Sequence, residues 1–78
     1  MFFRKATDDP AAGERAALLR ELQETQERLR QTDRIFNLAE APELTDYAIH
    51  ERRALMARHS YLLRMIRELD AAQSAAVL

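Results

Sequence analysis

An acidic and a basic residue lie on one stripe of a predicted helix, where such a pair could transfer protons. Glu51 and Arg58 are seven residues apart, which places them two helical turns from each other. Buried charged pairs have shifted pKa values suited to general acid–base chemistry. The alternative is a structural role, in which polar residues fix helix register and are satisfied by Thr32 and Thr25. We favour the structural role, because direct contact would require both long side chains to bend toward each other.

Three further residues have the spacing of a metal site on one helix face. Asp46 and His50 are four residues apart, at which spacing two side chains can share a metal, and Glu43 lies one turn earlier. A three-ligand site also needs neighbouring groups that orient the ligands, and nothing nearby supplies them. Carboxylates at a helix start are favourable to the helix dipole without any metal. We therefore expect no metal and no other cofactor.

Arginines are concentrated in the second half of the chain. Five of them, and no acidic residue, lie between residues 52 and 67. On a helix, Arg53, Arg64 and Arg67 follow one outer face over roughly 25 Å. Such a stripe could contact phosphates, although it lacks interleaved aromatic residues for base stacking. A solvated helix face is the simpler interpretation, and an acidic protein partner is another.

The whole chain limits these possibilities. Its 78 residues suffice for one small domain, and 12 basic against 13 acidic residues give a net charge of -1. The molecule therefore has no long-range attraction for nucleic acid or anionic lipid. The absence of cysteine excludes disulfides, thiolate zinc sites and cysteine nucleophiles. Because we find no glycine-rich phosphate loop and no Ser-His-Asp arrangement, we do not expect an enzyme.

Two predicted helices position these residues. One glycine and two prolines in 78 residues favour an all-α fold. Asp9 can cap a helix that starts at Pro10, and the Ala41-Pro42 pair interrupts the helical pattern. The expected organisation, in chain order, is a flexible N-terminal segment (1–9), a helical hairpin (10–72) with helices at about 10–40 and 42–70, and a frayed tail (73–78).

The apolar residues predict how the two helices pair. They recur in alternating steps of three and four, as in a coiled coil. Folding the chain antiparallel about residue 42 brings Leu22 opposite Leu62 and Phe36 opposite Ala48. The same register sets each of two threonines opposite a charged residue, which supports a long antiparallel two-helix hairpin. We call these four residues the polar seam: Thr25, Thr32, Glu51 and Arg58.

The second helix is apolar well beyond its seam. Apolar side chains extend along both flanks, an arc that one neighbouring helix cannot cover, and an isolated hairpin of this size has little core. A second copy is the economical cover, so we expect a homodimer that forms a four-helix bundle. The expected dimer-interface residues are Tyr47, Ile49, Met56, Tyr61, Leu63 and Ile66.

One segment of the second helix resembles the YaaL-like family of small uncharacterised bacterial proteins. Ala57, Leu63 and Arg64 match the pattern of that family, and the Phe3-Arg4-Lys5 start is similar to its short apolar-basic opening. Arg58 and Arg67 stand where lysines are common. The resemblance implies a bacterial cytoplasmic protein without an established activity, and it brings no catalytic residues.

A shorter resemblance lies near the C-terminus. Glu68, Leu69 and Asp70 resemble the motif of helical-hairpin phosphatases that act on response-regulator aspartates.

The apolar start, Met1 to Phe3, is far too short for a signal peptide or a membrane span, which also favours the cytoplasm and no membrane partner.

The functional prediction is a non-catalytic protein-interaction module that binds an unknown cytoplasmic protein. The alternative is a weak, sequence-nonspecific nucleic-acid binder that uses Arg53, Arg64 and Arg67. A phosphatase-like enzyme is a remote third hypothesis.

Overall fold

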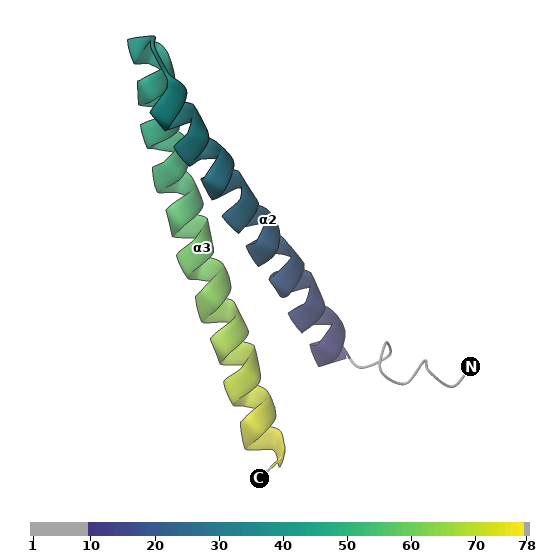
Figure 1. Ribbon diagram of the computed structural model, residues 1–78. Helices are drawn as coiled ribbons and strands as arrows, with labels where there is room; N and C mark the ends of the chain where they lie inside the picture. The colour runs from purple at the N-terminus through teal and green to yellow at the C-terminus, as the bar shows by residue number, and fades with distance from the viewer. Residues whose placement is uncertain (1–9, 78) are drawn as a thin grey trace, which may run out of the picture.

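The computed structural model describes residues 10–77, which form two helices joined by a short turn (Figure 1). Helix α2 spans Pro10–Leu38 and helix α3 spans Pro42–Val77. No strand occurs in this described part, so the all-α prediction is confirmed for it. The molecule is elongated and flat, with extents of 54 × 29 × 12 Å.

The helix ends follow from local sequence. Ala41 precedes a proline and cannot continue a helix, so α2 ends at Leu38 and α3 begins at Pro42. The Ala41 carbonyl accepts the backbone N–H groups of Leu44 at 3.1 Å and Thr45 at 3.3 Å, which closes the first turn of α3. The connection therefore needs only residues 39–41.

Two of the expected boundaries differ from the structure. Helix α2 ends two residues before the expected position, and α3 continues to Val77 rather than ending near residue 70. The last segment is rich in alanine and contains neither glycine nor proline, so its backbone keeps a strong helix propensity. The expected N-terminal segment, 1–9, lies outside the described residues.

The helices run antiparallel in one register. Three interhelical side-chain pairs place Arg15 against Asp70, Gln26 against His59, and Asp33 against Arg52. As the position on α2 rises from 15 to 26 to 33, its partner on α3 falls from 70 to 59 to 52. Each rise on α2 is matched by a fall of the same size on α3. In Figure 1 the axes meet at the turn end, where residues 39–41 join them, and separate toward the open end, near Pro10 and Val77.

The hairpin core is small and lies mostly away from the turn. Leu22, Leu62 and Ile66 form its main buried cluster. The partly buried hydrophobic residues around it are Leu18, Leu19 and Leu63. Other buried residues along the contact between the helices are Thr25, Thr32, Ala48 and Leu55.

Near the turn, large apolar side chains lie at the edge of the contact between the helices. Phe36, which we expected opposite Ala48, leaves 49% of its surface exposed, whereas Ala48 is 1% exposed. The small methyl group of Ala48 lets the two helices approach closely, so the Phe36 ring lies at the edge of the contact. Leu44, in the first turn of α3, is 50% exposed.

Candidate interaction surface

The two threonines of the polar seam are buried and satisfied within their own helix. Thr25 donates its hydroxyl to the Glu21 carbonyl at 2.8 Å, and Thr32 donates to the Arg28 carbonyl at 2.9 Å. The expected hydrogen bonds from these threonines to Glu51 and Arg58 are therefore replaced by bonds to the α2 backbone. A threonine hydroxyl on a helix reaches the carbonyl one turn earlier without any help from another element.

The charged seam residues pair with charges on α2 and not with each other. Arg28 donates to the Glu51 carboxylate at 2.7 Å, and Arg58 donates to the Glu21 carboxylate at 2.6 Å. Long side chains can place their charged groups at the solvated edge of the contact, which avoids the desolvation penalty of burying them. Glu51 and Arg58 thus neutralise opposite charges along one edge of the hairpin, a structural arrangement.

The opposite edge carries a second row of polar contacts. Arg52 donates to Asp33 at 3.0 Å, and the Nε2 atoms of Gln26 and His59 lie 3.4 Å apart. Because residues 51 and 58 flank the buried stripe on one side and residues 52 and 59 on the other, the two rows bracket the core. Both edges of the hairpin therefore have specific interhelical contacts.

An ion pair ties the open end. Arg15 donates from Nε to one carboxylate oxygen of Asp70 at 2.8 Å and from a terminal nitrogen to the other at 3.3 Å. These hydrogen bonds, together with the charge of Arg15, hold the pKa of Asp70 below its ordinary value, and the same contact raises the pKa of Arg15. Both oxygens of the carboxylate in the phosphatase-like motif are thus held by an arginine.

The residues with metal-like spacing remain on the surface. Glu43, Asp46 and His50 are all exposed. Within the described residues, no group of three His, Cys, Asp or Glu side chains is placed to hold a metal ion.

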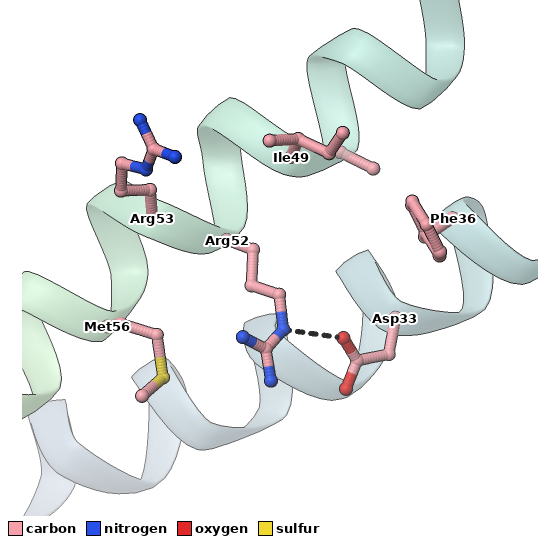
Figure 2. Close-up of a pocket in the computed structure, with 7 residues that line it drawn as sticks. Asp33, Phe36, Ile49, Arg52, Arg53 and Met56 are labelled. Carbon is pink, nitrogen blue, oxygen red and sulfur yellow. Dashed lines mark hydrogen bonds and ion pairs between the residues drawn. The ribbon is translucent and has the colours of Figure 1, made fainter.

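The structure separates the arginines of α3 into two groups. Arg52 and Arg58 bind carboxylates of α2, whereas Arg53, Arg64 and Arg67 are exposed on the outside of the hairpin. In Figure 2, Arg52 reaches across to Asp33 while Arg53 points away from α2.

The three outward arginines also differ in their contacts. The guanidinium of Arg64 lies 5.6 Å from the centre of the Tyr61 ring, and one of its nitrogens is 3.9 Å from Glu68. Among the described side chains, no carboxylate lies within ion-pair distance of Arg53 or Arg67. Arg53 and Arg67 are therefore available to a partner.

The expected dimer-interface residues divide between surface and core. Tyr47, Ile49, Met56 and Tyr61 are between 41% and 51% exposed. Leu63 is partly buried against the core cluster. Ile66 does not fit the expectation, because it is 8% exposed and packs with Leu22 and Leu62 inside the hairpin. It lies one turn after Leu62 and so shares the face that contacts α2.

Two apolar hollows flank the turn end. The larger, about 520 Å³, lies between the helices and is shown in Figure 2. We call it the interhelical groove; its lining residues are Asp33, Phe36, Ala48, Ile49, Arg52, Arg53 and Met56. A second hollow of about 420 Å³ lies beside the turn and is lined by Gln31, Arg34, Ile35, Leu38, Ala39 and Leu44.

Sequence patterns predicted only part of this surface. They marked Ile49 and Met56 as outward-facing, but they assigned Phe36 to the seam and drew no attention to Ile35 or Leu38. The available signal was that Ile35 and Leu38 are apolar residues outside the heptad positions of the first helix.

The comparisons with known proteins give one result. A family model described as a protein of unknown function (DUF2508) matches residues 1–72. The chain matches no curated protein and no solved structure. Within the described residues, neither helix has a stretch long and apolar enough to cross a membrane.

Proposed function

The chain belongs to the DUF2508 family of proteins of unknown function, and we propose that it acts as a non-catalytic protein-interaction module. One observation carries the proposal: among the described residues, eight large hydrophobic side chains are 37% to 76% exposed, whereas five hydrophobic residues are buried in the core. Contiguous exposed apolar surface on a small protein marks a binding site. The exposed residues are Ile35, Phe36, Leu38, Leu44, Tyr47, Ile49, Met56 and Tyr61.

Self-association is part of this proposal. Helix α2 covers one face of α3, while apolar side chains remain on both flanks of α3. A second hairpin would bury one flank of each copy and give a four-helix bundle, a common solution for amphipathic helical hairpins. The other flank, with Tyr47 and Tyr61, would stay available for a different protein.

Several contacts support a non-catalytic role. Each charged member of the polar seam is neutralised by an opposite charge on α2, and Asp70 is held by Arg15. The two hollows are lined mainly by apolar side chains and open to solvent. Groups paired in this way stabilise the hairpin, and this supports the proposed non-catalytic role.

We also propose a narrower placement within the family. The matches at Ala57, Leu63 and Arg64 support a YaaL-like protein, and that resemblance supports a bacterial source and a cytoplasmic location.

Light scattering tests the proposal directly. The wild-type protein at tens of micromolar should have twice the mass of one chain, because the apolar flank of α3 favours a second copy. A monomer at that concentration would contradict self-association. Circular dichroism on the same samples checks that the protein is helical.

A second function, weak nucleic-acid binding, is favoured by one observation: Arg53 and Arg67 have no described carboxylate within ion-pair distance. Fluorescence anisotropy with labelled single- and double-stranded oligonucleotides tests it. Binding that weakens steeply with salt and is lost when Arg53, Arg64 and Arg67 are all changed to Glu would support phosphate contacts. Absence of binding to either oligonucleotide at low salt would contradict this second function.

A further inference from the structure

We propose that the groove side of α3 binds a second copy of this chain, with the two α3 helices antiparallel and Met56 at the two-fold axis. The proposal rests on the self-association proposed above and specifies its face, direction and register. It leaves the flank with Tyr47 and Tyr61 outside the dimer contact.

The contact surface is a stripe along α3 beside the hairpin core, and one of its members, Leu63, also packs partly against the core cluster. Its members follow alternating steps of three and four, which keeps them on one helix face over roughly 32 Å. Ile49, Arg53 and Met56 also form one wall of the interhelical groove (Figure 2). We call it the groove stripe; its residues are Asp46, Ile49, Arg53, Met56, Ser60, Leu63 and Arg67.

The groove stripe is complementary to itself when its direction is reversed. A two-fold interface is reciprocal, so residue i of one copy meets j of the other and j meets i. When α3 of the second copy runs in the opposite direction and the two Met56 side chains meet, Asp46 lies opposite Arg67, and this ion pair occurs twice. The same reversal sets Ile49 opposite Leu63 and leaves Met56 against its own copy. Acid therefore meets base, and apolar meets apolar.

The remaining position is also compatible with the antiparallel arrangement. Reversal sets Arg53 opposite Ser60, whose hydroxyl can accept a hydrogen bond from the guanidinium. A parallel arrangement would instead bring Asp46, Arg53 and Arg67 each against its own copy, giving three like-charge contacts. Like charges facing each other across a helix contact are destabilising, so the charges favour the antiparallel direction.

The charged residues of the groove stripe are available for this pairing. Among the described side chains, neither Asp46 nor Arg67 has an ion-pair partner, and both are exposed. Their neighbours in sequence differ, since Arg52 and Arg58 are already bound to Asp33 and Glu21 of α2. Asp46 and Arg67 thus lie on the groove stripe, outside the hairpin contact, without an ion pair to another described side chain.

The interhelical groove adds apolar surface from α2. Phe36 lines it from α2 and Ile49 lines it from α3. In the antiparallel register, Leu63 of the second copy lies opposite Ile49 and so beside Phe36. The half-exposed phenyl ring, which the hairpin core does not cover, would be covered by the second copy.

A charge swap tests the direction and register. Asp46→Arg and Arg67→Asp should each raise the dimer dissociation constant about tenfold or more at low salt, because each change puts like charges opposite each other twice. The double variant Asp46→Arg/Arg67→Asp restores both pairs and should return the constant to within about threefold of wild type. Arg20→Asp, an exposed change on α2, is the matched control and should have little effect.

Cysteine crosslinking gives an independent test, because the chain contains no cysteine. Under oxidation, Met56→Cys should form a disulfide between two copies, since the position meets itself at the axis. Ile49→Cys should not link alone, but the double variant Ile49→Cys/Leu63→Cys should. Non-reducing gels report the products, and circular dichroism confirms that each variant is helical.

The outcomes distinguish this proposal from self-association in general. A wild-type dimer in which Met56→Cys stays unlinked, or in which the charge swap gives no rescue, would overturn the register and leave the dimer standing. Efficient linking of Ile49→Cys alone would show a parallel arrangement and also overturn it. A wild-type monomer in light scattering would overturn both proposals.

Discussion

The turn end and the open end of the hairpin use hydrophobic residues in opposite ways. At the turn end, large apolar side chains such as Leu38 and Leu44 are at least half exposed. Toward the open end, Leu22, Leu62 and Ile66 form the main buried cluster. Chain connectivity explains the difference. Residues 39–41 hold the helices together at the turn end, whereas contact at the open end brings together residues far apart in sequence, at a larger cost in chain entropy.

This difference indicates which apolar residues are free for another role. Near the turn, the covalent connection through residues 39–41 and the close approach at Ala48 hold the two helices together. Side chains such as Phe36 therefore contribute little to the hairpin itself. Their exposure supports the interaction surface proposed above.

Truncation should have its largest effect in the open-end cluster. Leu62→Ala removes a side chain that is 1% exposed and should lower the free energy of unfolding by roughly 2–5 kcal/mol. Leu38→Ala is the matched change at the turn end, where the side chain is 76% exposed, and should change the free energy of unfolding by only about 0.5 kcal/mol. Urea unfolding followed by circular dichroism, at equal protein concentrations, measures both.

Equal losses for the two variants would contradict the comparison. They would mean that Leu38 is packed in solution as tightly as Leu62, and that the turn end has a core of its own.

Much of this contrast could be read from the sequence, and part of it could not. Periodicity and the proline at position 42 predicted the two helices and their antiparallel direction, because these depend on local backbone preferences and on which face is apolar. The pattern also marked Thr25 and Thr32 as contact positions, and both are buried.

The same pattern could not predict how closely the helices approach. Heptad positions specify a direction from the helix axis and carry no information on separation, so they placed Phe36 inside a contact that leaves half of its surface exposed. Ile66 was assigned to a flank for a related reason: a position at the border of the core face is buried or exposed according to where the neighbouring helix lies. The charged seam residues could not be paired correctly because a long side chain can reach either edge of the contact.

A glycine in α2 gives a smaller effect and sharpens the comparison at the open end. Gly13 is exposed near the helix start, and no atom lies within 4 Å of the position that a Cβ would take. Gly13→Ala should therefore raise the free energy of unfolding by about 0.5–1 kcal/mol, because alanine loses less backbone entropy on forming a helix. Denaturant unfolding detects a change of this size, and a destabilised variant would show that the site is crowded in solution.

The smallest effect is expected for the ion pair at the open end, and it should depend on pH. The hydrogen bonds from Arg15 hold the pKa of Asp70 below its ordinary value of 3.8 in the folded state. The folded state thus favours the charged carboxylate, and the stabilisation is fully present above the unfolded pKa and disappears as pH falls through the folded pKa. Because both side chains are partly exposed, water screens the pair and the effect is small.

Asp70→Asn tests that pH dependence. Near neutral pH the variant should melt at a slightly lower temperature than wild type, and the difference should disappear as the pH falls through the folded-state pKa of Asp70. Glu27→Gln is the control, since its pKa is also lowered, by Arg30 on the same helix. Of these two ion pairs, only Arg15–Asp70 joins α2 to α3, so only Asp70→Asn should speed hydrogen exchange of backbone amides at the open end of both helices. Equal exchange in the two variants would mean that the open end is held by Leu22, Leu62 and Ile66 alone.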